Sequence, residues 1–137
     1  MNPLGVYLHI PYCLHKCGYC DFNSHPENQK ESEIYVSALL LEIDHYAPRL
    51  AGKRVSTVFF GGGTPTILPP ASLDKILGRV KSLFTLSSDC EITIEANPAT
   101  VKQETLAQIR SSGFNRISIG VQSFDADELK LLERVHN

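Results

Sequence analysis

The sequence predicts an α/β domain in which strands and helices alternate around a parallel sheet. Four short runs rich in β-branched and aromatic residues are separated by longer segments with helical patterns. Repeated strand–helix alternation implies parallel strands joined by right-handed crossovers. The 137 residues are enough for one domain with its own hydrophobic core. Two architectures fit this pattern, a doubly wound sheet and a part of a βα barrel.

The four strands are predicted from their composition and length. Each run consists mainly of Val, Ile, Phe, Tyr or Thr and is short enough to be a single strand. The predicted strands cover residues 6–10, 55–60, 91–95 and 116–119.

Helices are predicted in the segments between the strands. The first covers residues 32–47, which are rich in Ile, Leu and Ala, and it ends before Pro48 because proline disfavours helix in the preceding residue. In the second, the apolar residues from Leu73 to Phe84 fall on one face at a period of 3.6 residues. The polar stretch from His25 to Ser32 is predicted to be a surface loop.

Capping residues locate the last two helices. Thr100 and Gln103 match a capping box, and Gly113 is a suitable C-terminal stop for the same helix. The acidic run at residues 125–128 is predicted to cap a fourth helix. The apolar residues expected on that helix are Leu129, Leu132 and Val135.

Composition narrows the classes of function. The net charge is −2 and no run of Lys and Arg is present, so the sequence shows no basic segment typical of nucleic-acid binding. No apolar stretch approaches the length of about 18–20 residues that a membrane span needs. Residues 1–5 lack the basic start and the apolar run of a signal peptide. We therefore expect a cytoplasmic protein with no transmembrane segment and no nucleic-acid partner.

Three cysteines, Cys13, Cys17 and Cys20, follow the first predicted strand with the spacing C-x3-C-x2-C. Ligands of parallel βα sheets bind at the C-terminal ends of the strands, so this loop lies where a cofactor is expected. In a reducing compartment, three cysteines so close together indicate a metal site more than a disulfide framework.

The number of thiolates narrows the kind of metal site. A structural zinc ion takes four ligands, and a [4Fe–4S] cluster that only carries electrons takes four cysteines. Three thiolates leave one iron of such a cluster open to another ligand. Cys90 enters the third strand from its opposite end, and we interpret it as a small buried apolar residue. The alternative is a zinc site with a histidine as fourth ligand, for which the candidates are His9, His15 and His25.

The other predicted strands also end in residues suited to a bound ligand. The glycines at 61–63 directly follow the second strand and allow a ligand to approach the bare backbone, although they also fit a simple tight turn. They lack the Lys-Ser/Thr ending of a phosphate-binding P-loop. Glu95 ends the third strand, where a carboxylate points into the site or is a solvated loop acid. Residues 120–123 follow the fourth strand.

This combination resembles the radical S-adenosylmethionine (SAM) superfamily. The cysteine spacing, with the aromatic Tyr19 before the last cysteine, carries the resemblance, and further landmarks follow in order along the chain. It implies a [4Fe–4S] cluster on Cys13, Cys17 and Cys20, and reductive cleavage of SAM as the available chemistry. In that resemblance Arg134 pairs with the SAM carboxylate. The SAM contacts that it implies are Tyr7, Tyr19, Gly62, Gly63, Thr64, Glu95, Gln122 and Arg134.

Residues 9–13, 61–66 and 118–124 together resemble the oxygen-independent coproporphyrinogen III oxidases and their close relatives. Oxidases of that group carry a further cysteine two residues after the third, and Phe22 stands at that position here. This departure favours the haem chaperone branch of the family. The alternative is the oxidase itself, which converts coproporphyrinogen III to protoporphyrinogen IX, so the sequence leaves open whether the chain is an enzyme.

The resemblance also implies partners and a more specific fold. The expected partners are SAM, haem or a porphyrin, an electron donor such as flavodoxin or ferredoxin, and a haem-acceptor protein. The expected fold is a partial (β/α)6 TIM-like barrel. Residues 1–137 are expected to form the N-terminal part of this core domain, with about four βα units and the C-terminal remainder absent.

Overall fold

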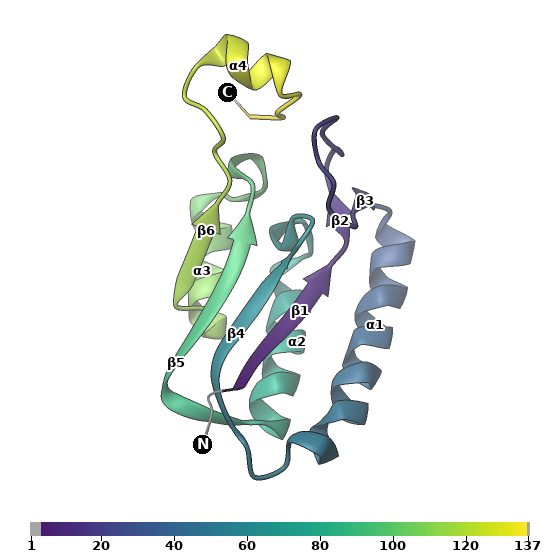
Figure 1. The fold of residues 1–137 in the computed structure, drawn as a ribbon, viewed down its shortest axis with the longest axis vertical. Coiled ribbons are helices and arrows are strands. Elements are labelled where there is room, and N and C mark those ends of the chain that lie inside the picture. Colours follow the sequence, from purple (N-terminus) through teal and green to yellow (C-terminus); the bar gives the residue numbers. More distant parts are fainter. Residues whose placement is uncertain (1–3, 137) are drawn as a thin grey trace.

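The computed structural model describes residues 4–136, and four parallel strands form its main sheet (Figure 1). The predicted domain range of 1–137 extends past the described residues at both ends. In the sheet, the order is β1-β4-β5-β6, so the strands lie side by side in chain order. A doubly wound sheet reverses its strand order at a switch point, whereas a βα barrel does not. The structure therefore selects the barrel-type alternative. The strands are β1 (Leu4–Ile10), β4 (Arg54–Gly62), β5 (Thr85–Ala96) and β6 (Arg116–Ile119).

Three long helices cover one face of the sheet, and a short fourth helix lies beyond the C-terminal ends of the strands (Figure 1). The three are α1 (Gln29–Tyr46), α2 (Pro70–Leu83) and α3 (Gln103–Ser112), and the fourth is α4 (Ala126–Leu131). Two short strands, β2 (Tyr12–Cys13) and β3 (His25–Pro26), pair with each other above β1. Short 3-10 turns complete the described elements: η1 (Ala47–Leu50), η2 (Pro65–Ile67) and η3 (Pro98–Thr100).

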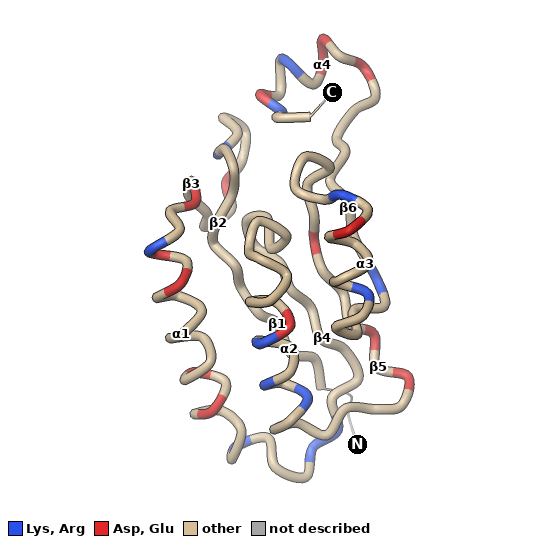
Figure 2. The backbone as a smooth tube through the Cα atoms, turned by 180° about the vertical axis from the view of Figure 1, so that it is seen from behind, with Lys and Arg blue, Asp and Glu red and all other residues tan. Residues whose placement is uncertain are grey.

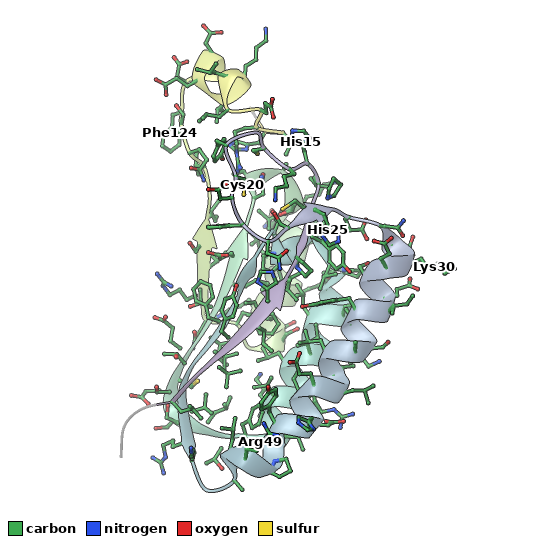
Figure 3. All side chains as sticks on the ribbon, turned by 45° about the vertical axis from the view of Figure 1, so that its right-hand side comes forward. His15, Cys20, His25, Lys30, Arg49 and Phe124 are labelled. Carbon is green, nitrogen blue, oxygen red and sulfur yellow. The ribbon has the colours of Figure 1, made fainter. Side chains whose placement is uncertain are left out.

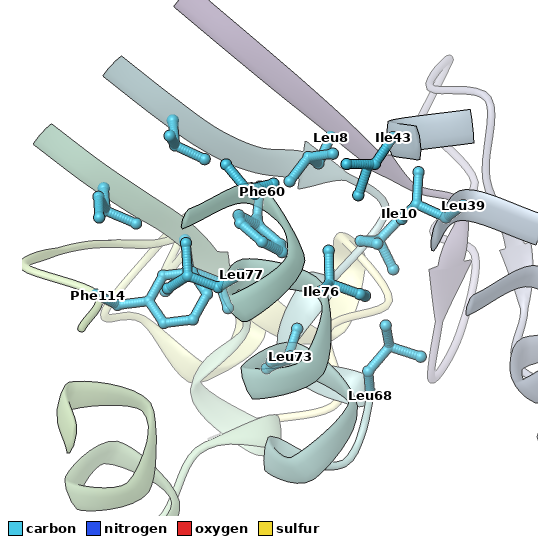
Figure 4. Packing of buried hydrophobic residues seen from close by; sticks show 14 of the residues in the cluster. Leu8, Ile10, Leu39, Ile43, Phe60, Leu68, Leu73, Ile76, Leu77 and Phe114 are labelled. Atoms are coloured by element: carbon cyan, nitrogen blue, oxygen red, sulfur yellow. The ribbon is translucent and has the colours of Figure 1, made fainter. Parts of the chain in front are cut away.

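The core lies between the sheet and the helices (Figure 4). Phe60 of β4 is fully buried, and its ring meets Phe114 edge-on with centroids 4.9 Å apart. From α2, Leu73, Ile76 and Leu77 pack beneath the strands. Each large apolar side chain that is removed from water contributes about 1.5–3 kcal/mol. This packing holds the strands in a fixed arrangement and so fixes the positions of their ends.

The opposite face of the sheet carries the alternate residues of the same strands. Tyr7 of β1 stacks on Phe59 of β4 with ring centroids 6.1 Å apart, and Glu95 of β5 is in register with Ser118 of β6. Because successive side chains of a strand point to opposite faces, burying one set against the helices leaves the other set free for a ligand.

The structure corrects the predicted start of the first helix. The surface loop predicted at 25–32 is wrong at both ends, since His25 and Pro26 form β3 and Ser32 is buried within α1. Helix α1 begins at Gln29 because the Asn28 side chain accepts hydrogen bonds from the next backbone N–H groups. The third strand is also longer than predicted, because its first residues pair with β4 across a bulge.

Two further helix boundaries differ from prediction. Thr100 does not cap α3, because its hydroxyl donates to the Asn97 carbonyl at 2.7 Å and lies 2.6 Å from the Thr66 hydroxyl oxygen. The predicted stop at Gly113 is confirmed, with a left-handed φ of 108°. Asp125 caps α4 as predicted, but this helix ends at Leu131, so Val135 and Leu132 lie beyond it.

Basic and acidic residues both occur along the helices (Figure 2). Within residues 4–136, no helix combines the length and the apolar character that crossing a bilayer requires.

Candidate functional site

The cysteine loop, residues 13–20, is held at the C-terminal end of β1 by backbone and lysine hydrogen bonds. The Cys20 N–H donates to the Cys17 carbonyl at 3.0 Å, which closes a tight turn. The Lys16 ammonium donates to the carbonyls of Phe22 at 2.8 Å and Ser24 at 2.9 Å. These bonds fold the lysine back on its own loop and give the cysteines a defined arrangement.

Gly63 and Thr64 lie directly against the start of the cysteine loop. The Gly63 N–H donates to the Ile10 carbonyl at 2.8 Å, and the Thr64 N–H donates to the Tyr12 carbonyl at 2.7 Å. A Cβ atom at Gly63 would lie 2.9 Å from the Cys13 sulfur, so a larger residue would displace the loop. The glycine run thus allows β4 and the cysteine loop to approach closely, and the Thr64 hydroxyl lies 3.7 Å from the Cys13 sulfur.

The same glycine run receives the carboxylate of Glu95. The Gly62 N–H donates to Glu95 Oε2 at 3.2 Å, and a Cβ atom at Gly61 would lie 2.9 Å from that oxygen. Gly62 has a φ of 115°, which favours glycine. Placing a carboxylate at the end of β5 therefore depends on bare backbone at the end of β4.

The guanidinium of Arg134 joins the segment after α4 to the cysteine loop. Its Nη2 donates to the Gly120 carbonyl at 2.6 Å. Its Nη1 lies 3.3 Å from the Tyr19 hydroxyl and 3.7 Å from the Cys17 sulfur. The Nε atom is buried and has no hydrogen-bond partner among the described residues. A buried donor without a partner is costly, so this atom is a marker for a missing acceptor.

A cavity of about 540 Å³ opens between the cysteine loop and the ends of β5 and β6. A smaller cavity of about 190 Å³ adjoins it on the open face of the sheet and shares Glu95 and Phe22 with it. Tyr7 and Gly62 line the smaller cavity. Cys13, Cys17 and Thr64 are not among the residues that line either cavity. Of the predicted residues, the larger cavity is lined by Tyr19, Cys20, Gly63, Glu95, Gln122 and Arg134.

Tyr7 and His9 form a hydrogen-bonded chain that leads to the segment after the cysteines. His9 Nε2 lies 2.9 Å from the Asn23 carbonyl oxygen, which can only accept, so this nitrogen carries the proton. His9 Nδ1 then accepts from the Tyr7 hydroxyl at 2.9 Å. Burial, together with the nearby Glu95 carboxylate, raises the pKa of Tyr7, so its hydroxyl keeps the proton that it donates.

The histidines proposed as fourth zinc ligands have other contacts. Both ring nitrogens of His9 are hydrogen-bonded, and His15 Nε2 lies 3.3 Å from a Glu133 carboxylate oxygen. His25 packs edge-on against Tyr12. Within residues 4–136, no three His, Cys, Asp or Glu side chains converge as ligands of one metal ion do. In a [4Fe–4S] cluster each thiolate binds a different iron atom, so the cysteines that hold it need not converge on a single point.

Further residues line the larger cavity and were not found from the sequence. Ser118 comes from β6, and Asp21 comes directly after the last cysteine of the loop. The period of two along β6, combined with its parallel pairing to Glu95, is the signal that could have identified Ser118. No comparable signal marks Asp21.

Fold and site together define a class of protein. A βα-barrel sheet with a three-cysteine loop and a cavity at its strand ends is a cofactor-binding barrel. The chain belongs to the radical SAM superfamily, whose sequence profile matches residues 7–137. Membership implies SAM and a [4Fe–4S] cluster as cofactors.

Curated relatives agree with this assignment. The heme chaperone HemW of Escherichia coli (strain K12) is 44% identical over 137 residues, which cover 99% of this chain and 36% of that protein. HemW of Mycobacterium tuberculosis (strain ATCC 25618 / H37Rv) is 41% identical over 139 residues, covering 99% of this chain and 36% of that protein. The oxygen-independent coproporphyrinogen III oxidase of E. coli (strain K12) is 38% identical over 134 residues, covering 97% of this chain and 29% of that protein.

A solved structure supports the fold directly. Coproporphyrinogen III oxidase (HemN) from E. coli, described as a radical SAM enzyme, superposes with a TM-score of 0.92 at 38% sequence identity. The match covers 98% of this chain and 31% of that one, which confirms the predicted fold as part of a radical SAM barrel. The chain spans about a third of the length of the curated relatives that it matches.

The described residues fit the two cofactors that the family implies. Three free thiols lie on one loop. Beside them, the glycines at 61–63 let the end of β4 lie in close contact with the cysteine loop and with Glu95, and the buried Arg134 Nε lacks an acceptor among the described residues. A cluster needs the thiolates, and a ligand with a carboxylate suits the guanidinium.

Proposed function

We propose that this chain is the cluster- and SAM-binding part of a haem chaperone of the radical SAM superfamily. Cys13, Cys17 and Cys20 are the cluster ligands. The observation that carries the proposal is the position of Arg134, whose guanidinium reaches the Cys17 sulfur at 3.7 Å while its buried Nε lacks a partner. A cation of this shape beside a cluster ligand suits a SAM carboxylate.

The remaining SAM contacts follow from the cavity. Gly62, Gly63 and Thr64 are assigned to SAM because they end β4 beside the cysteine loop, and the Glu95 carboxylate offers an acceptor for an ammonium group. Tyr19 and Gln122 line the larger cavity. Tyr7 lines the adjoining one, and because its hydroxyl proton is donated to His9, its oxygen can only accept a further hydrogen bond.

When bound, the cluster and SAM supply reductive cleavage of the SAM sulfonium, driven by one electron from a donor of the flavodoxin or ferredoxin type. The chain contributes binding and orientation: Arg134 and Glu95 fix opposite charges of the ligand, while Tyr19 and Phe22 cover apolar surface around it. Four free cysteines fit a reducing compartment, for which we propose the cytoplasm.

The proposed cargo is haem, delivered to an acceptor protein. It is supported by the two relatives named heme chaperone, at 44% and 41% identity. Phe22 is 63% exposed and lines both cavities at the position where the sequence resemblance expects an additional cysteine in the oxidases. An oxidase activity on coproporphyrinogen III is the second candidate, favoured by the close superposition on HemN.

Anaerobic reconstitution with iron and sulfide tests the proposal. We expect about four iron and four sulfide ions per chain. The electron paramagnetic resonance (EPR) spectrum of the reduced cluster should change when SAM is added. A reconstituted chain that holds the cluster but whose EPR spectrum does not change when SAM is added would contradict the proposed function.

Assays with porphyrin ligands separate the two candidates. Coproporphyrinogen III, supplied with SAM and a reductant, should be left unchanged by the loaded chain and by Phe22→Cys. Consumption of this substrate would favour the oxidase. The handling of haem should be measured by transfer to an apo-haem protein, with the same chain carrying Cys17→Ala as the matched control.

A further inference from the structure

Glu133 has a backbone conformation that its residue type disfavours. Its φ is 53°, and Gln122, with a φ of 70°, is the other non-glycine residue with positive φ among residues 4–136. Left-handed backbone is unfavourable for an ordinary L-residue, and such residues gather at functional sites. Gln122 lines the larger cavity, and Glu133 directly precedes Arg134. The surrounding structure must therefore hold Glu133 in place.

The contacts that hold Glu133 come from the cysteine loop, more than 110 residues earlier in the chain. Its carboxylate oxygen Oε2 accepts from the Gly18 N–H at 2.9 Å and lies 3.3 Å from His15 Nε2. Its backbone carbonyl oxygen lies 3.8 Å from the Cys17 sulfur. Glu133 thus contacts the loop through its side chain and its backbone, and Figure 3 shows His15 and Cys20 on the loop close to α4.

The left-handed turn at Glu133 sends neighbouring side chains to two sides of the same loop. The Glu133 carboxylate meets the loop at Gly18, whereas the next side chain, Arg134, enters the cavity and reaches Cys17. The turn is completed by the Arg134 N–H, which donates to the Leu129 carbonyl at 2.9 Å. A change in how Glu133 holds Gly18 therefore alters the spacing between a cluster ligand and the proposed carboxylate-binding arginine.

The charge of Glu133 suits this role. Its carboxylate accepts from the Gly18 N–H at 2.9 Å and lies 3.3 Å from His15 Nε2. A carboxylate accepts from a backbone N–H more strongly than a neutral oxygen does. As an isolated surface ion pair, by contrast, the half-exposed His15–Glu133 contact would contribute little to stability.

We propose that Glu133 is a positioning residue, whose carboxylate anchors the cysteine loop at Gly18 and His15 and thereby sets the spacing between Cys17 and Arg134. This inference rests on the proposed function, because it assigns the consequence of that spacing to cluster retention and SAM binding. Nothing in the cysteine motif itself requires an acid at position 133.

Two substitutions test the role. Glu133→Gln keeps the shape and removes the charge, and we expect about fivefold weaker SAM binding, the difference between a charged and a neutral acceptor. Glu133→Gly removes the anchor and relieves the left-handed backbone, so the chain folds without the conformational cost. For this variant we expect at least tenfold faster loss of iron to a chelator, with an unchanged or higher melting temperature. Faster iron loss without a fall in melting temperature would distinguish a positioning role from a general structural role.

The matched control is Asp127→Asn, which removes one negative charge from α4 at an exposed side chain with no hydrogen bond among the described residues. All chains are reconstituted anaerobically and compared by iron release, EPR line shape and SAM dissociation constant. The double variant His15→Ala/Glu133→Gln should change iron release and SAM affinity by less than the sum of the two single-variant effects. Both substitutions disturb the same contact.

Two results would overturn the inference. One is iron release and SAM affinity in Glu133→Gln and Glu133→Gly that match Asp127→Asn. The other is faster iron release that is matched by a proportionate fall in melting temperature, because that pattern indicates ordinary destabilisation of the fold. If the unaltered chain takes up no cluster or does not respond to SAM, the proposed function itself fails, and the two failures are thereby distinguished.

Discussion

Replacing Arg134 by alanine should weaken SAM binding by about ten- to a hundredfold. The guanidinium is already oriented, with Nη2 on the Gly120 carbonyl at 2.6 Å and Nη1 at 3.3 Å from the Tyr19 hydroxyl, while the buried Nε has no partner. A charge-assisted hydrogen bond to a carboxylate contributes about 1.5–3 kcal/mol. At about 1.4 kcal/mol for each factor of ten, this range gives the stated loss of affinity.

Two further variants sharpen the Arg134 prediction. Arg134→Lys should fall between the parent and the alanine variant, because an ammonium keeps the charge but lacks the planar fork of donors. Arg79→Ala is the matched control, since Arg79 Nε lies 3.4 Å from Asp44 in an exposed pair on the helical side of the domain. Removing an exposed pair changes stability by about 0–1 kcal/mol and should leave SAM affinity unchanged.

Isothermal titration of SAM into anaerobically reconstituted protein measures the effect. Dissociation constants should be compared only between samples of equal iron content, because Arg134 also approaches the Cys17 sulfur. An Arg134→Ala chain with a full complement of iron and an unchanged dissociation constant would refute the assignment of this residue to the SAM carboxylate.

The remaining predictions concern the cluster, the core, a turn and the sheet edge. Alanine at any one of the three clustered cysteines should abolish the iron–sulfur absorbance. Cys90→Ala, which removes a thiol buried in β5, should retain this absorbance. Loss of the absorbance in Cys90→Ala would contradict the assignment of Cys13, Cys17 and Cys20 as the cluster ligands. Phe60→Ala should lower the free energy of unfolding in urea by about 3–5 kcal/mol, while Phe124→Ala, at a fully accessible ring, should leave it nearly unchanged. Gly113→Ala should cost about 1 kcal/mol or more because its φ is 108°, measured by thermal melting; an unchanged melting temperature would show that the turn adapts. The chain alone should self-associate through edge strand β6, and Ile119→Lys should restore a monomer in size-exclusion chromatography; a parent chain that is already monomeric would refute this.

Much of the fold was accessible from sequence because its signals are local. Hydrophobic runs predicted all four main strands, and the rule that ligands bind at strand ends brought Glu95 and the glycine run to one site. Capping chemistry located Asp125 and Gly113 correctly. The failure at Thr100 has a specific cause: its hydroxyl lies 2.6 Å from that of Thr66, a partner 34 residues away that local pattern does not reveal.

The cavity was harder to predict than the strands. Its position followed from topology, but Ser118 and Asp21 were found only in the structure. The boundary of α4 shows the same limit, since a helical pattern continued past the point at which the chain turns at Glu133. That turn is held by contacts with Gly18, which lies at a sequence separation of 115 residues. Interactions of this range are decided by packing and leave no trace in a local window.

The arrangement of strands explains why these irregular segments matter. β1 and β6 are at opposite edges of the sheet, yet Cys17 and Arg134, which follow them, lie 3.7 Å apart. The cysteine loop and the segment after β6 must therefore extend over the strand ends to meet, and the left-handed residues Gln122 and Glu133 lie in the second of these segments. The sheet fixes Glu95 through its packed core, whereas the Cys17–Arg134 spacing depends on a few hydrogen bonds between two segments of irregular backbone. Substitutions in the core should consequently change stability first, and substitutions in these segments should change cofactor affinity first.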